Sequence, residues 1–375
     1  VSDGLPDRRL RFGLRHPPLA AMASTRKPRR GRRVFLWMLG AFFAVQIAAG
    51  MLLDRVWPQL RFSFLYKQLD RLEEQPVPPT VVCLGSSRFG CGIAGDHMTD
   101  WLRRLTGDPN VSVFNASIPA GDLLVSELMM RRLLERGVRP RFAVIELCPE
   151  VLNHRNDWLK IHLHRHLVWT DVPRYFTEIT LTGNLMRLLT HRLLPLYQYR
   201  EDICKELEES LQAKLDGWMG KTKEASAGPG GHRVIDWDSL VGNYYKKLTD
   251  DQREKTNIGL YDVRRCLRSY QAGGNAGAAL ERLLNTCAAH GVTPVLIGVP
   301  VSEPQRQLYV PAIEESYRSY VADVVKRHGC RYLDMRDRVP DALFVDNHHM
   351  VHEGSLFFSK MLTEEALLPL WRAGK

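Results

Sequence analysis

The 375-residue sequence lacks the signatures of several large protein classes. It contains no Walker loop, no dinucleotide-binding fingerprint and no spaced set of zinc ligands, so these sites are not indicated. Its seven cysteines form no C-x-x-C pair, and an odd, scattered set argues against a disulfide framework. Several of them lie in apolar runs, where a thiol packs as a small hydrophobic group. We therefore interpret the cysteines as core residues.

Excess positive charge is nearly absent outside the N-terminus. Residues 1–33 contain ten Lys or Arg against Asp3 and Asp7, which accounts for eight of the ten net positive charges and leaves +2 for the rest. A basic tail therefore explains the charge, and nucleic-acid binding by the body is not predicted.

One long hydrophobic run is present, Val34–Leu53, interrupted only by small residues and Gln46. Twenty helical residues span ~30 Å, the thickness of a bilayer core. Because the basic tail precedes the run, we predict a single-pass anchor in the cell membrane, with a cytoplasmic N-terminus and an extracytoplasmic body. A cleaved signal peptide and a twin-arginine export signal at 32–36 are alternatives. Met22 is a more natural start than Val1, so residues 1–21 are interpreted as an upstream extension.

Four segments follow from these patterns. We predict a basic cytoplasmic tail (1–33), an anchor (34–53), a juxtamembrane helix and linker (54–79) and a folded domain (80–375). The domain contains a helical insertion at 151–258, far longer than a crossover requires. We expect it to be a lid or substrate platform, with a Gly-rich break at Ala225–Gly231.

From residue 80 the pattern alternates between strands and helices. The predicted strands are Thr80–Leu84, Val111–Asn115, Phe142–Leu147, Pro294–Val299 and Arg331–Met335. The predicted helices are Ile93–Leu105, Asp122–Glu135, Ala276–Ala289, Pro311–Arg327 and Ser355–Leu370. Short, unalternating apolar strands joined by helices indicate a parallel sheet covered on both faces. The prediction is an α/β fold, a three-layer α/β/α sandwich with a five-stranded flavodoxin-like sheet.

Two stretches carry candidate chemistry. The first, V-V-C-L-G-S-S-R-F-G-C-G at Val81–Gly92, places serines at a turn between a strand and a helix, where open α/β sheets bind their ligands. The second, D-N-H-H-M-V-H-E-G, begins at Asp346. Together they resemble the first and last sequence blocks of the SGNH (GDSL-like) hydrolase superfamily. The G-S-S variant is similar to a membrane-anchored branch with the D-alanine transfer protein of teichoic acid and proteins that O-acetylate polysaccharides.

The resemblance implies a Ser-His-Asp triad of Ser87, His349 and Asp346 that needs no cofactor. It implies oxyanion donors at the amides of Ser87 and Gly121. This chain has Cys148-Pro149-Glu150 where the family's third-block asparagine is expected, and Asn153 or another group from the insertion is the candidate substitute.

Alternatives remain for some of these roles. Ser86 is a second candidate nucleophile, and Asp346, His348 and His352 are a conceivable metal set, although we predict no metal site. Arg88 is interpreted as a residue that holds an anionic substrate group or pairs with a carboxylate.

The function implied is an acyl-ester hydrolase or O-acyltransferase acting on an extracytoplasmic, cell-envelope glycan. The expected partners are an acylated glycan or other ester, the membrane, and a membrane-bound acyl donor. The alternative is a catalytically silent scaffold of the same fold in a cell-envelope assembly.

Overall fold

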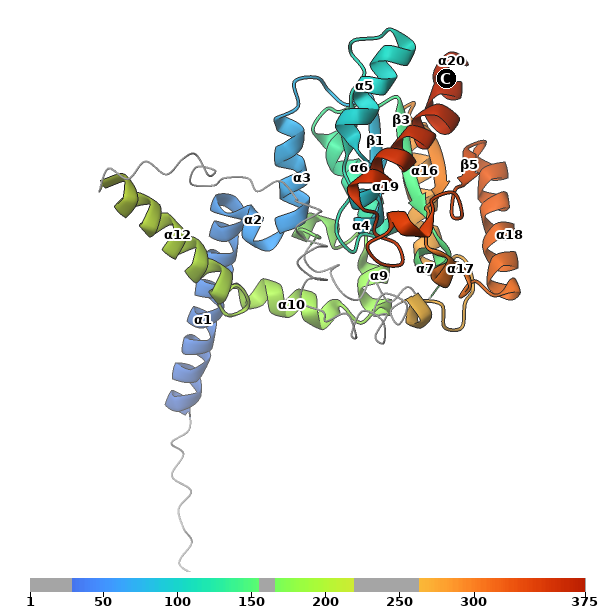
Figure 1. Cartoon of the computed structure of the whole chain (residues 1–375). Helices are drawn as coiled ribbons and strands as arrows, with labels where there is room; N and C mark the ends of the chain where they lie inside the picture. Colours follow the sequence, from blue (N-terminus) through green and yellow to red (C-terminus); the bar gives the residue numbers. More distant parts are fainter. Residues whose placement is uncertain (1–28, 155–165, 219–262, 375) are drawn as a thin grey trace, which may run out of the picture. The chain divides into compact units, whose positions relative to one another are not determined.

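The computed structural model describes residues 29–154, 166–218 and 263–374. The chain forms two compact units, one up to Val45 and one from Gln46 to Lys375. The second unit contains a five-stranded parallel sheet with the strand order β2-β1-β3-β4-β5 (Figure 1). The strands are β1 (Val81–Leu84), β2 (Val113–Asn115), β3 (Phe142–Leu147), β4 (Thr293–Gly298) and β5 (Arg331–Asp334). The predicted flavodoxin-like α/β fold is confirmed.

The central strands are apolar and fully covered. Every residue of β1 and β3 is buried, and Val81 pairs with Val113 of β2 on one side and Phe142 of β3 on the other. A strand buried on both faces needs no alternation of polar and apolar residues, which is why these runs read as continuous hydrophobic segments.

Helices cover both faces of the sheet (Figure 1). On one face α6 (Leu123–Glu135) packs against α16 (Gly274–Ala289), and α18 (Pro311–His328) lies beside α16, where Tyr320 approaches Gly277. On the other face α4 (Ser87–Gly92) and α5 (Gly95–Thr106) pack against α19 (His352–Met361). The three glycines that follow α6, α16 and α18 have left-handed φ values of 82°, 67° and 59° and are Gly137, Gly291 and Gly329.

The last predicted helix is interrupted by a change of helix type. After α19 the backbone forms a π-helical turn, Leu362–Leu367, and then α20 (Leu368–Arg372). Pro369 has no backbone N–H to donate to the preceding turn, which explains why regular α-helical bonding does not continue through this point.

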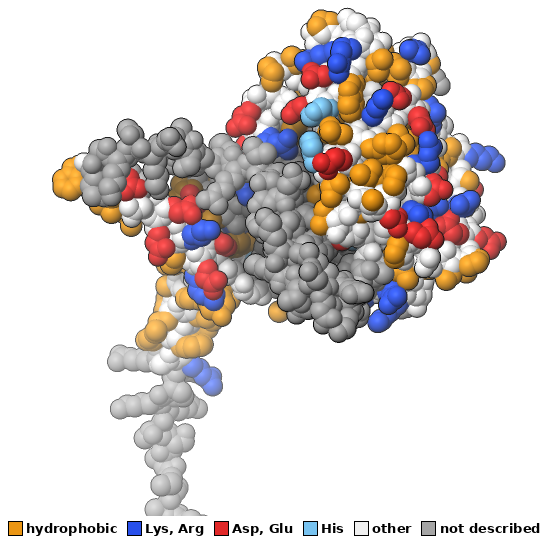
Figure 2. All heavy atoms as spheres, in the orientation of Figure 1, with side chains coloured by type: hydrophobic (Ala, Val, Ile, Leu, Met, Phe, Trp, Pro, Cys, Tyr) orange, Lys and Arg blue, Asp and Glu red, His pale blue; other side chains and the backbone are white. Residues whose placement is uncertain are grey.

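The N-terminal helix is α1 (Arg29–Val56), of which residues 31–56 are long and apolar enough to cross a membrane. Many of its apolar side chains are exposed (Figure 2). Phe35 is 63% exposed and Trp37 is 79% exposed, whereas Leu53 near its end is buried. The juxtamembrane segment is two helices, α2 (Pro58–Arg61) and α3 (Ser63–Glu73), and not a continuation of α1, because Pro58 begins a new helix.

The insertion is helical where the structure describes it. Its helices are α7 (Pro149–Leu152), η2 (Trp169–Asp171), α9 (Phe176–Leu181), α10 (Leu185–Leu193), α11 (Pro195–Gln198) and α12 (Arg200–Trp218). Between α9 and α10 the helical path is broken at Gly183, whose φ is 71°. Ion pairs join the insertion to the helices of the sheet domain, among them Arg132 with Asp171 and Arg282 with Glu178. The predicted break at Ala225–Gly231 lies outside the described residues.

Candidate active site

The turn after β1 is shaped by a glycine and a buried carboxylate. A Cβ on Gly85 would lie 2.8 Å from the Cβ of Glu146, a residue of β3, so only glycine fits. Glu146 accepts hydrogen bonds from the Ser86 amide at 2.7 Å and from the Ser86 hydroxyl at 2.8 Å. Burial raises the pKa of Glu146, and Arg88 and these hydrogen bonds oppose that rise. The chain therefore turns sharply at the carboxyl end of β1, with Ser86 fixed against the neighbouring strand.

The two serines of the turn have different partners. Ser86 is the N-cap of α4, and its hydroxyl accepts a bond from the Arg88 amide as well as donating to Glu146. The hydroxyl of Ser87, the first residue of α4, lies 2.8 Å from His349 Nε2. The geometry thus separates the two candidate nucleophiles, because only Ser87 faces an imidazole.

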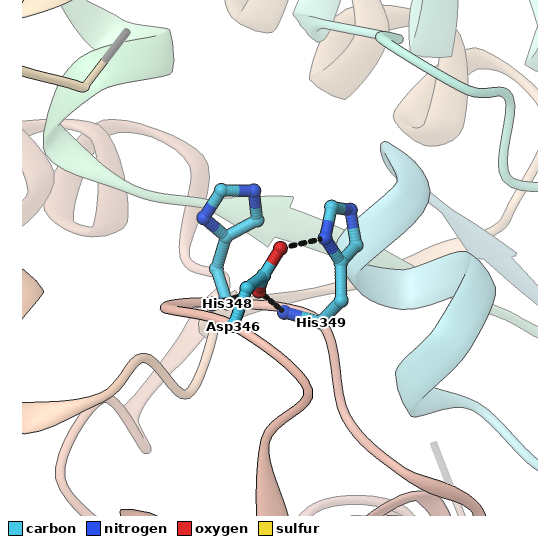
Figure 3. A group of neighbouring side chains, drawn as sticks. All are labelled: Asp346, His348 and His349. Carbon is cyan, nitrogen blue, oxygen red and sulfur yellow. Dashed lines mark hydrogen bonds and ion pairs between the residues drawn. The ribbon is translucent and has the colours of Figure 1, made fainter. Parts of the chain in front are cut away.

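His349 and Asp346, the predicted base and acid, lie in one tight loop between η3 (Asp341–Leu343) and α19. Asp346 Oδ1 accepts the backbone N–H groups of His348 at 2.7 Å and His349 at 2.6 Å, which folds the loop back on itself. Asp346 Oδ2 lies 2.6 Å from His349 Nδ1 (Figure 3). A carboxylate only accepts, so His349 Nδ1 carries the proton and Nε2 presents its lone pair to Ser87.

The structure therefore brings Ser87, His349 and Asp346 into one hydrogen-bonded chain. A hydroxyl that donates to a neutral imidazole, which in turn donates to a carboxylate, is the arrangement that activates a serine for acyl transfer. The catalytic role of the three residues stays a prediction, while their proximity is a geometric fact.

The two predicted oxyanion donors differ in whether their backbone N–H already has an acceptor. The Ser87 amide is the first N–H of α4, a position at which no helix carbonyl can accept it. Gly121 lies close to the turn, since a Cβ there would come 3.0 Å from the Gly85 carbonyl oxygen, but its amide donates to Ile118 at 2.8 Å. Of these two donors, the Ser87 amide is the better placed.

Asn153 is held elsewhere. Its side-chain amide donates to the carbonyls of Cys266 at 2.6 Å and Arg268 at 3.2 Å, and its oxygen accepts from the Gln271 amide. Both amide hydrogens are used in joining the start of the insertion to the segment before α16, so this geometry does not favour the oxyanion role predicted for Asn153.

The departure at Cys148-Pro149-Glu150 has a structural explanation. Arg88 is 1% exposed and lies 2.5 Å from Glu150, which is fully buried, and 2.7 Å from the Cys148 sulfur. Of the two interpretations of Arg88, the structure therefore shows the pairing with a carboxylate. The residues that follow β3 thus form a buried ion pair with Arg88, next to the turn that carries Ser86 and Ser87.

Hydrogen bonds connect the Arg88–Glu150 ion pair to His348, the other histidine of the loop. Glu150 accepts from the Gln305 amide at 2.7 Å and from the Tyr309 hydroxyl at 2.9 Å. Since the Gln305 amide nitrogen faces this carboxylate, its oxygen is the acceptor for His348 Nδ1 at 3.1 Å. Burial lowers the pKa of His348 well below its usual value, so His348 is neutral, with its proton on Nδ1.

Asp346, His348 and His349 each place one possible metal ligand within 4.8 Å of the others (Figure 3). Both nitrogens of His349 and Nδ1 of His348 are already used in hydrogen bonds. His352 begins α19, and its ring lies beside that of His97, 6.3 Å between centroids. Because these ring nitrogens are used in hydrogen bonds, the geometry favours a hydrogen-bonded site over a metal site.

Sequence reasoning missed Glu146, Glu150 and Gln305 as parts of this site. One signal was present, because Glu146 is the only charge in a strand that is otherwise apolar. A buried charge needs a partner, but the sequence does not say which one.

Residues 49–355 match the family described as "Protein of unknown function (DUF1574)". No curated protein matches.

Among solved structures, a variant of Axe2, an acetylxylan esterase from Geobacillus stearothermophilus, is 11% identical, with a TM-score of 0.35, covering 78% of this chain and 95% of that one. The lipase/acylhydrolase from Enterococcus faecalis is 12% identical, with a TM-score of 0.34 and coverage of 76% and 94%. LAE5, an alpha/beta hydrolase enzyme from the metagenome of Lake Arreo, Spain, is 12% identical, with a TM-score of 0.34 and coverage of 76% and 95%. These scores are low, so the function proposed below is drawn from the site and not from these proteins.

Proposed function

We propose an activity for this chain from its site, because the chain belongs to the DUF1574 family, whose description assigns none. The proposed activity is that of a serine-dependent acyl-ester hydrolase or acyltransferase. The observation that carries the proposal is the continuous chain of hydrogen bonds from Ser87 Oγ through His349 to Asp346, with distances of 2.8 and 2.6 Å. It lies at the carboxyl end of β1, the edge at which open α/β sheets place their ligands.

The reaction would proceed in two steps. His349 Nε2 accepts the Ser87 proton while Oγ attacks the ester carbonyl, and the leaving alcohol receives that proton when the acyl-enzyme forms. Water or an acceptor hydroxyl then gives its proton to His349 and attacks the acyl group, and His349 returns that proton to Ser87 Oγ as the bond between Oγ and the acyl carbon breaks. The Ser87 amide, at the start of α4, is a donor for the oxyanion in both steps.

The orientation of α1 extends the proposal to the substrate. With ten basic residues before the apolar run, we propose an uncleaved single-pass anchor with the triad outside the cell membrane. An ester on an extracytoplasmic glycan is then the substrate class in reach, with a membrane-bound donor supplying the acyl group if the enzyme transfers it.

A fluorophosphonate probe tests the chemistry directly, because it forms a covalent bond only with an activated serine. The purified full-length chain should be labelled at Ser87, and Ser87→Ala should not be labelled. Ser86→Ala is the matched control, since its hydroxyl donates to Glu146, and it should be labelled. Absence of labelling in the folded wild-type chain would overturn the proposal and favour the catalytically silent scaffold.

A further inference from the structure

The apolar run of α1 contains one polar side chain with a specific partner. Gln46 is 7% exposed, and its Oε1 accepts a hydrogen bond from the backbone N–H of Leu196 at 3.2 Å. Leu196 is in the first turn of α11, where the N–H groups have no acceptor within the helix. The polar residue that interrupts the apolar run therefore caps a helix of the insertion.

Further contacts hold the same region together. A Cβ on Gly50 would lie 3.3 Å from the Pro195 side chain, so glycine allows α1 and α11 to approach closely. Arg61 of α2 donates to the Gly50 carbonyl at 3.0 Å. Arg61 also pairs with Asp54 at 2.8 Å, and Arg192 of α10 lies 3.6 Å from the same carboxylate. Two cations thus share one acid at the end of the apolar run.

These contacts fix the depth of the insertion relative to the apolar run. Gln46 lies seven residues before Leu53, the last residue of that run, which is about 10 Å along a helix. If the run crosses a bilayer, the N-terminus of α11 lies below the outer boundary of the hydrocarbon layer. Backbone N–H groups at that depth need an internal acceptor, and Gln46 supplies one.

Several apolar side chains are exposed on this part of the insertion, and the charged Arg187 of α10 is exposed beside them. Leu181 and Met186 are each 70% exposed, Tyr197 is 61% exposed and Leu196 is 38% exposed. The guanidinium of Arg200 lies 4.7 Å above the Tyr197 ring. Tyrosine is enriched at the boundary between lipid and water, and arginine near a helix end extends its charge to that boundary.

We propose that α10 and α11 lie in the outer leaflet of the membrane, joined to the anchor by Gln46, so that the body docks on the lipid surface. The inference rests on the proposed membrane anchor and not on the chemistry of the triad. The partner of the surface formed by α10 and α11 is the lipid bilayer, since this surface continues directly from a helix that has the length and composition of a membrane span.

A lipid-quenching experiment tests the proposal on the full-length chain. Cys204 is the exposed cysteine and the other six are buried, so a Cys204→Ser background carries single bimane labels at Met186→Cys, Phe42→Cys or Val310→Cys. The chain is placed in phosphatidylcholine/phosphatidylglycerol nanodiscs containing doxyl-labelled phosphatidylcholine. The labels at residue 186 and at residue 42 in α1 should both lose emission, and the label on exposed Val310 should lose none.

Quenching at residue 42 without quenching at residue 186 would overturn the docking and leave the anchor intact. A label at 186 that is shielded from water but not quenched would indicate a protein partner and would also overturn it. Absence of quenching at both positions would overturn the anchor itself. Fluorophosphonate labelling of Ser87 in the same samples reports the proposed chemistry separately.

The role of Gln46 is tested in the same assay. Gln46→Met keeps the length of the side chain and removes the acceptor of the Leu196 amide, so quenching at residue 186 should fall while quenching at residue 42 is unchanged. Val45→Met is the matched control, because Val45 is 60% exposed, and it should change neither. Unchanged quenching at residue 186 in Gln46→Met would show that Gln46 does not hold the insertion in the lipid.

Discussion

Asp346→Asn perturbs the candidate triad with the least change in shape. Asp346 Oδ1 accepts two backbone N–H groups, at 2.7 and 2.6 Å. An asparagine can keep both bonds only if its carbonyl oxygen takes that position. Its NH₂ group then takes the position of Oδ2, 2.6 Å from His349 Nδ1. Two donors cannot face each other, so His349 must move its proton to Nε2.

The tautomer decides the activity. With the proton on Nε2, His349 donates to Ser87 where it should accept, and the serine loses its base. The corresponding change in a serine protease lowers kcat by roughly 10⁴-fold while the geometry is preserved. We expect a loss of about this size here, and a smaller one than for Ser87→Ala, for which triads of this kind lose about 10⁶-fold.

The assay is the release of nitrophenol from nitrophenyl acetate under single-turnover conditions, together with ¹⁵N NMR of the imidazoles to read the tautomer. Ser87→Ala combined with Asp346→Asn should be no slower than Ser87→Ala alone, because members of a triad act as one unit. If Asp346→Asn retains most of the wild-type rate with His349 protonated on Nε2, His349 is not the base and the reasoning fails.

Three further predictions concern the residues behind the triad. Ser86→Ala should lower the unfolding free energy by about 1–2 kcal/mol through the loss of a helix cap, with esterase activity within tenfold of wild type. Glu150→Gln leaves the buried Arg88 guanidinium without its carboxylate, and chemical denaturation should show a loss of roughly 3 kcal/mol. Because burial lowers the pKa of His348 in the folded chain, protonation favours the unfolded state. Stability should therefore fall as the pH drops below the unfolded histidine value of about 6.5, by up to about 1.4 kcal/mol per pH unit. His348→Asn keeps a donor to Gln305 and should remove this part of the pH dependence.

Each of these has a result that would contradict it. Loss of fluorophosphonate labelling in folded Ser86→Ala would make Ser86 part of the chemistry. Wild-type stability in Glu150→Gln would mean that the ion pair between Arg88 and Glu150 contributes nothing to the free energy of unfolding. The same pH dependence of unfolding in His348→Asn as in wild type would assign that dependence to other groups.

The sheet was predictable because its determinants are local. Short apolar segments buried on both faces appear as continuous runs in the sequence, and glycines such as Gly137 and Gly329 end helices through a backbone conformation that other residues rarely adopt. Asp346 and His349 were identified by the resemblance of the last sequence block, and their spacing of three residues lets a carboxylate and an imidazole meet within one loop.

The separation of Ser86 from Ser87 was decided by tertiary structure. Both serines follow the same strand, and only the approach of Glu146 on one side and of His349, 262 residues away, on the other assigns a different partner to each. The sequence cannot report which carboxylate meets a given hydroxyl, because that depends on the register of neighbouring strands. The same holds for Arg88, whose partner lies beyond the end of β3.

Gln46 in α1 also shows the difference between what the sequence determines and what the folded chain decides. The sequence alone determined that one polar residue interrupts an apolar run long enough to cross a membrane. Only the folded chain brings the Leu196 amide, 150 residues later, against that side chain. A polar group in an apolar helix is costly unless it is paired, and its partner is set by packing between distant segments and not by the local pattern.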